Sequence, residues 1–140
     1  MNSRRILAGL IIFAACGLTL ALAGGNNFDR LTTADRATMQ ERFSKEIWPL
    51  LERGGKQGCV GCHTPGKGSL KMSGKADKDF LMLVKEGFFI PDDSGSILSR
   101  ITSKNKKQMM PPPGKGDPWM KADIEVLQKF VADLDKKQKK

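Results

Sequence analysis

The amino-acid sequence predicts an all-α fold, and three observations support that prediction. Apolar residues recur at helical spacing over residues 39–51 and again over residues 124–134, which is the pattern of helices that bury one face. No stretch shows the sustained alternation or the enrichment in β-branched residues that is typical of a strand. Clusters of glycine and proline separate the shorter segments. With 140 residues and no internal repeat, the chain is expected to form one domain.

The first helix is expected to begin near Ala34, with Thr33 as its N-cap. Pro49 has no amide hydrogen and is expected to kink or end this helix, and Gly54-Gly55 marks the exit from it. Its buried face consists of apolar residues at four-residue spacing and the two that follow them: Met39, Phe43, Ile47, Leu50 and Leu51.

Two short helices and a long one are predicted next. Asp77 or Asp79 is expected to cap a helix over residues 80–84, and Gly87 suits its C-terminal end. A turn at residues 91–94 precedes one or two helical turns around residues 97–101, and residues 102–117 form a polar, proline-rich loop. The final helix is predicted to run from Trp119 to Lys136. Its buried stripe consists of Ile124, Leu127, Phe130, Val131 and Leu134.

The first 23 residues have the pattern of an export signal. Two arginines precede an apolar run over residues 6–22, and Ala21-Leu22-Ala23 is an A-x-A cleavage signature. The prediction is a signal peptide over residues 1–23 and a periplasmic or otherwise extracytoplasmic location. Two alternatives stay open: the apolar run at residues 6–23 is just long enough to remain as a membrane tether, and Cys16 follows a weak lipidation pattern.

The chain is basic, with a formal net charge of +9. Removal of residues 1–23 takes away two arginines and no acidic residue, so the net charge falls from +9 to +7. In the absence of a nucleic-acid-binding motif, this charge indicates a docking surface for redox partner proteins with acidic patches, or for anionic membrane. A solvated, solubilising surface is the simpler alternative. Residues 136–140 are predicted to form a frayed basic tail.

Cys59 and Cys62 are the only cysteines after residue 23, and His63 is the only histidine in the chain. Cys-x-x-Cys-His is the attachment pattern of c-type haem. The spacing lets each thiol form a thioether with one of two neighbouring vinyl groups at the porphyrin edge, and the next residue then brings its imidazole to the iron. We therefore expect one covalently attached haem c, with His63 as an iron ligand.

Three other interpretations of this motif fit less well. A structural zinc site normally uses four Cys or His ligands, and only three exist here. A thiol–disulfide oxidoreductase uses Cys-x-x-Cys within a βαβ context, which this sequence lacks. A structural disulfide would leave the adjacent His63 without a role.

The second iron ligand is expected to be a methionine, because the chain has no second histidine. Met109 and Met110 lie in the polar loop directly before three prolines, which stiffen the backbone that must hold a weak thioether ligand. Met110 adjoins the prolines and is favoured over Met109. The other methionines lie where packing is a sufficient role: Met39, Met72, Met82 and Met120.

Four segments carry a family resemblance: residues 43–51 before the haem motif, Gly68–Met72 after it, Ser96–Ile101, and Met110-Pro111-Pro112 before the closing helix. Together with Cys59–His63 they resemble the class I cytochrome c superfamily and, more narrowly, the planctomycete-type cytochrome c domain. The resemblance covers roughly residues 40–135. It implies a cytochrome c fold over residues 24–135, with crossed N- and C-terminal helices and with short helices and loops around one covalent haem. It also implies His63 and Met110 as the axial ligands of the iron.

The predicted function is that of a monohaem c-type cytochrome, which carries single electrons in an extracytoplasmic respiratory or dehydrogenase-linked chain. An iron with both axial positions filled has no place for a substrate, so no enzymatic activity is expected. Two other functions remain open. In a haem-based sensor or binding protein for a small ligand, Met110 would detach or never bind. In a larger oxidoreductase complex, the chain would be a fixed electron-relay subunit.

Overall fold

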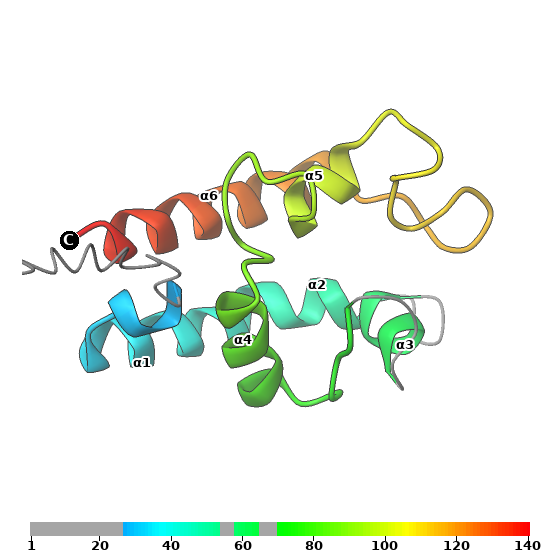
Figure 1. The fold of residues 1–140 in the computed structure, drawn as a ribbon. Coiled ribbons are helices and arrows are strands. Elements are labelled where there is room, and N and C mark those ends of the chain that lie inside the picture. The colour runs from blue at the N-terminus through cyan, green and yellow to red at the C-terminus, as the bar shows by residue number, and fades with distance from the viewer. Residues whose placement is uncertain (1–26, 54–57, 65–69) are drawn as a thin grey trace, which may run out of the picture.

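The computed structural model describes residues 27–53, 58–64 and 70–140 (Figure 1). Within these ranges all regular structure is helical and no strand occurs, which confirms the all-α prediction for this part of the chain. The predicted signal peptide over residues 1–23, Cys16 within it, and the predicted helix exit at Gly54-Gly55 lie outside the described residues. Among the helices of the described ranges, none combines the length and apolar character needed to cross a membrane.

The described residues form a series of helices and helical turns, most of them short. They are the 3-10 turn η1 (Asn27–Arg30), α1 (Thr33–Arg42), the π-helical turn η2 (Phe43–Ile47), α2 (Trp48–Glu52), α3 (Cys59–His63), α4 (Ala76–Lys85), α5 (Ile97–Thr102) and α6 (Lys121–Gln138).

The helix predicted to begin near Ala34 is present as one continuous helical segment made of α1, η2 and α2. Its N-cap is Thr32, one residue before the predicted Thr33, and the Thr32 hydroxyl oxygen accepts the amide hydrogen of Asp35 at 3.1 Å. A hydroxyl in this position satisfies one of the first amide groups, which have no partner within the helix.

Pro49 was expected to kink or end this helix; the helix does not end there but continues to Glu52. A π turn lies directly before the proline, and in it the amide of Trp48 donates to the carbonyl of Phe43, five residues back. Pro49 has no amide hydrogen to donate, and its ring would clash with the preceding turn of a regular α-helix. The wider π turn changes the hydrogen-bonding register at this point, and the helix can therefore continue past the proline.

Phe43 lies at the centre of an aromatic core. Its side chain is fully buried, and its ring centroid lies 5.4–6.2 Å from the rings of Trp48, Phe80, Phe89 and Phe130. These rings come from α2, from α4 and the turn after it, and from α6. The predicted apolar faces of the first and last helices therefore meet at this cluster, where tilted and edge-to-face ring pairs are favourable.

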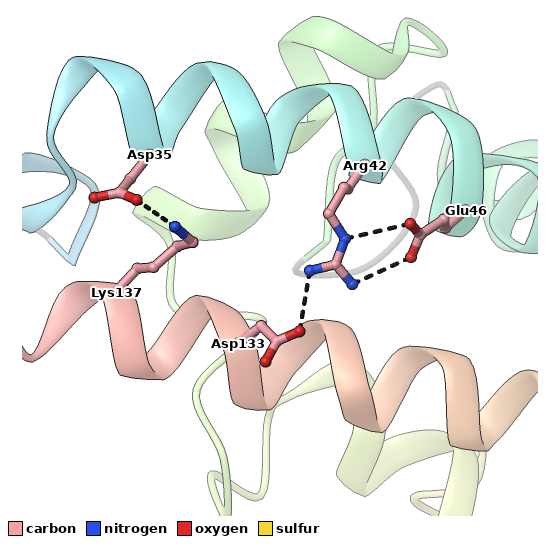
Figure 2. Close-up of polar contacts among 5 residues, drawn as sticks. All are labelled: Asp35, Arg42, Glu46, Asp133 and Lys137. Carbon is pink, nitrogen blue, oxygen red and sulfur yellow. Dashed lines mark hydrogen bonds and ion pairs between the residues drawn. The ribbon is translucent and has the colours of Figure 1, made fainter.

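Helix α6 runs antiparallel to the α1–α2 segment (Figure 1). Ion pairs join the two helices along their length: Lys137 with Asp35, Arg42 with Asp133 at 3.0 Å, and Arg53 with Asp123. Arg42 also pairs with Glu46 on its own helix at 3.2 Å, so one guanidinium holds two carboxylates (Figure 2). Besides these ion pairs, the backbones of α6 and the α1–α2 segment come close to each other mainly at η2.

The bounds of α6 differ from the predicted bounds at both ends. The helix begins at Lys121 and not at Trp119, and it ends at Gln138 and not at Lys136. Part of the predicted basic tail at residues 136–140 is therefore helical, and its Lys137 is held by the ion pair with Asp35 on α1 (Figure 2).

Helix α5 forms where it was predicted, and α4 covers the predicted residues 80–84 but is longer, since it begins at Ala76 and ends at Lys85. Gly87 follows α4 with a φ of +79°, the left-handed conformation that glycine adopts without strain. The predicted cap of α4 is wrong, because Lys75 occupies the N-cap position without a side-chain hydrogen bond. Asp77 is exposed, and the Asp79 carboxylate instead binds two amides of the loop before the helix.

Candidate functional site

The Cys-x-x-Cys-His motif forms a single helical turn, α3. The turn is closed by a hydrogen bond from the amide of Cys62 to the carbonyl of Gly58 at 2.9 Å, and by one from Thr64 to Val60 at 2.8 Å. Residues three and four apart lie on the same face of a helix. The spacing of Cys59, Cys62 and His63 therefore gathers two thiols and an imidazole on one side of α3.

The His63 ring is oriented by a backbone carbonyl from another segment. Its Nδ1 lies 3.0 Å from the carbonyl oxygen of Leu70, and the amide of Met72 donates to the His63 carbonyl at 3.1 Å. A carbonyl oxygen only accepts, so Nδ1 carries the hydrogen of this bond and Nε2 of the neutral ring carries the lone pair. Histidines that bind metals in proteins are held in this way through their other ring nitrogen.

Met110 lies in the loop between α5 and α6, as predicted, and its amide donates to the carbonyl of Arg100 at 3.0 Å. It lines two cavities together with Cys59 and His63, and Cys62 also lines one of them. The neighbouring Met109 is half-buried and lines neither of these cavities. Cys59, Cys62, His63 and Met110 are thus brought together, although Met110 is far from the other three in sequence.

The remaining methionines differ in their environment. Met39 and Met72 are buried in the core and Met82 is half-buried against it, in agreement with a packing role. Met120 precedes the first turn of α6 and is 59% exposed, so the packing role predicted for it is wrong.

The two cavities have volumes of about 60 Å³ and about 230 Å³, and they share Cys59, His63 and Met110 in their walls. Each volume lies below the ~300–1,000 Å³ that is typical of cofactor and small-molecule sites. The smaller cavity is lined by Leu50, Trp119 and the Arg53 and Asp117 side chains, and the larger by Leu51, Leu70, Ile97 and Ile101. Apolar walls with a few charged groups suit a large, flat and mostly apolar ring.

The donor set fits a c-type haem in three respects. The two thiols lie one helical turn apart, the imidazole is oriented through Nδ1, and a thioether side chain reaches the same cavities from another segment. Within the described ranges, no group of three or more His, Cys, Asp or Glu side chains is arranged to hold a metal ion. The zinc interpretation therefore gains no support from this part of the chain.

The acidity of Cys59 bears on the thiol–disulfide alternative. Burial raises the pKa of the Cys59 thiol to about 11. A cysteine that reacts as a nucleophile in disulfide exchange has a lowered pKa, because the thiolate is the reactive form. At neutral pH Cys59 stays protonated, which is the opposite of what such an oxidoreductase needs.

The sequence did not reveal three contributors to this site. The Leu70 carbonyl is a backbone group, so no residue type marks it. Trp119, in the loop before α6, lines the smaller cavity, and Arg100, in α5, lines the larger one. Only the arginine had a signal in the sequence, its place in the segment Ser96–Ile101.

Comparison with known proteins yields no assignment. No protein family matches the chain, and neither characterised proteins nor solved structures give a significant match.

Proposed function

We propose that this chain is a monohaem c-type cytochrome that carries single electrons outside the cytoplasm. Cys59 and Cys62 would hold the haem through thioether bonds, and His63 and Met110 would be its two axial ligands. The haem supplies the one-electron chemistry of its iron, and the chain supplies attachment, ligation and an apolar enclosure.

One observation carries the proposal: Cys59, Cys62, His63 and Met110 line one cavity, and the His63 ring is oriented by the Leu70 carbonyl. Attachment requires two thiols one helical turn apart, and ligation requires a neutral imidazole whose lone pair lies on Nε2. The hydrogen bonds of α3 support the spacing of the thiols, and the hydrogen bond from Nδ1 of His63 to the Leu70 carbonyl supports the orientation of the ring. The proposed cytochrome c fold rests on this site and on the family resemblance.

Met110 supports a carrier over a sensor. The backbone hydrogen bond from Met110 to Arg100 and the prolines that follow restrict the loop that would hold the thioether against the iron. With Met110 held in this way and His63 on the other side, the chain would fill both axial positions of the iron, and a substrate or a gas would be excluded.

The same loop supports docking to an acidic redox partner. Residues 103–121 contain one acidic residue, Asp117, and the lysines in this stretch are all exposed: Lys104, Lys106, Lys107, Lys115 and Lys121. Positive charge around the loop that carries an axial ligand would attract an acidic surface to the part of the molecule nearest the iron.

Optical spectra of the purified exported protein, oxidised and reduced, with and without carbon monoxide, test this function. We expect the wild type to carry covalent haem and to bind carbon monoxide slowly or incompletely. Replacement of Met110 by Ala should remove the methionine-sensitive absorption and open the iron to rapid carbon monoxide binding. The reduction potential should fall by on the order of 0.1 V, because axial ligand identity spans about 0.8 V across haem proteins.

Met109→Ala is the matched control, since it removes the same side chain from the next position and should leave spectrum and potential unchanged. Rapid and complete carbon monoxide binding by the wild type would favour the sensor. An unchanged spectrum in the Met110 variant would exclude Met110 as ligand, and absence of covalent haem from the wild type would exclude the function altogether.

A further inference from the structure

Asp79 is a charged residue in the interior that the site described so far does not use. Its side chain is 1% exposed, although aspartate is rarely buried without a partner. Its two carboxylate oxygens accept the amide hydrogens of Ser73 at 2.6 Å and of Gly74 at 3.0 Å. Hydrogen bonds from amides to an ionised acceptor are stronger than those between neutral groups.

The two amides belong to the segment that holds His63. Leu70, three residues before Ser73, provides the carbonyl bonded to Nδ1 of His63, and the intervening Met72 donates its amide to the His63 carbonyl. At the other end of the segment, a Cβ added to Gly74 would lie 3.8 Å from the side chain of Thr64, the residue after His63. Residues 70–74 therefore run alongside His63 and Thr64.

The carboxylate itself is fixed to the core. Asp79 lies in α4, and the next residue, Phe80, is fully buried with its ring 5.4 Å from that of Phe43. Leu83 and Val84, one turn further along α4, are also buried. A helix packed in this way moves little, so the Asp79 side chain connects the rigid core to an otherwise irregular loop.

We propose that Asp79 is a positioning residue that fixes the segment 70–74 and thereby the hydrogen bond from His63 to Leu70. The proposal rests on the function proposed above, in which His63 is an iron ligand. A strong hydrogen bond at Nδ1 raises the basicity of the ligating nitrogen and stabilises the oxidised iron. Loss of Asp79 should weaken that bond and raise the reduction potential.

The test compares two variants of the haem-loaded protein, Asp79→Asn and Asp77→Asn. Both remove one negative charge from the first turns of α4, but Asp77 is exposed and binds neither amide. Asparagine keeps the size of Asp79 and leaves one of the two amides facing an NH₂ group. The main readout is hydrogen exchange at Nδ1 of His63, followed by NMR in the reduced state, together with the reduction potential.

We expect hydrogen exchange at Nδ1 of His63 to become about tenfold faster in Asp79→Asn. The variant lacks the charged hydrogen bonds from Asp79 to the segment 70–74, and loss of one such bond favours local opening of a segment by about that factor. The potential should rise, while Asp77→Asn stays close to the wild type in both readouts. Equal exchange rates in the two variants and the wild type would overturn the proposal.

A wild-type measurement covers the case in which Asp79→Asn does not fold. If Asp79 holds the segment as one unit, then Nδ1 of His63 and the amides of Ser73 and Gly74 exchange through the same opening and respond equally to denaturant. Hydrogen exchange at Nδ1 of His63 that is much faster than exchange at the amides of Ser73 and Gly74 would contradict the proposed role of Asp79. Failure of the proposed function is separately visible, because the wild type would then carry no haem or would bind carbon monoxide rapidly and completely.

Discussion

Substitution of Gly58, the residue before Cys59, tests whether α3 requires the close approach of residue 58 to the backbone of residues 52 and 53. Its φ of −72° and ψ of 172° suit any residue, so alanine there carries no conformational penalty. The cost is steric. A Cβ at position 58 would lie 2.2 Å from the carbonyl oxygen of Arg53, 3.1 Å from its carbonyl carbon, and 3.2 Å from the carbonyl oxygen of Glu52.

Contacts of a Cβ atom below 3.0 Å essentially do not occur in proteins, so a separation of 2.2 Å requires a backbone shift of close to an ångström. The obstacle is main chain and not the end of a flexible side chain. Overpacking of this kind costs ~1–3 kcal/mol, a factor of about 5 to 160 in the unfolding equilibrium. Because the Gly58 carbonyl also accepts the amide hydrogen of Cys62, the shift should displace the two thiols relative to each other.

The assay has two parts: the fraction of exported protein that carries covalent haem, and the free energy of unfolding from guanidinium titration. Gly58→Ala should lower both. Gly87→Ala is the matched control, because its φ of +79° predicts a comparable loss of ~1–2 kcal/mol while the backbone around α3 is untouched. The atom nearest to a Cβ at position 87 is the end of a side chain, Cδ1 of Ile90 at 2.9 Å, and not main chain. A Gly58 variant with full haem content and a stability change below about 0.5 kcal/mol would refute the steric argument.

Two further predictions concern the scaffold. Phe43→Ala should lower the free energy of unfolding by ~3–5 kcal/mol, because it removes a fully buried ring that meets four others; a guanidinium titration that gives less than about half of this loss would contradict the central place assigned to the ring. The hydrogen bond from Lys137, followed by that from Thr32, lowers the pKa of Asp35 below its usual 3.8, so Asp35 stabilises the folded state above about pH 4 and loses that effect as pH falls through its folded pKa. Asp35→Asn should therefore be less stable than the wild type at pH 7, with a difference in melting temperature that closes on acidification; a difference that is independent of pH would exclude this ion pair as its cause.

The features predicted from sequence are those with a local cause. The apolar stripe of α6 and the glycine after α4 depend on spacing along one helix or on one backbone angle. The glycine was predicted correctly, and so was the stripe except for Ile124, which is only half-buried. The gathering of Cys59, Cys62 and His63 follows from helical spacing in the same way, once those residues form a turn.

The features that the sequence did not predict depend on two distant segments at once. The π turn before Pro49 keeps both Phe43 and Leu51 buried, which a break in the helix would prevent. Asp79 has the position of a helix cap in the sequence, yet the loop before α4 folds back and presents two amides to it. No residue type encodes the approach of the Leu70 carbonyl to His63. These contacts are set by tertiary packing, which overrides local preference.

The two cavities lie at the edge of the hydrophobic core. The four phenylalanines of the core, Phe43, Phe80, Phe89 and Phe130, line neither cavity. The buried core residues Leu51, Met72 and Ile97 line the larger cavity, together with Cys59 and His63 of α3 and with Met110. On the proposed function, the haem would extend the apolar core at this edge, and its bonds to two cysteines and two axial ligands would tie α3 and the Met110 loop to it. Ligation and stability are then coupled: a substitution that loosens His63 or Met110 changes the potential and also weakens the part of the fold that encloses the iron.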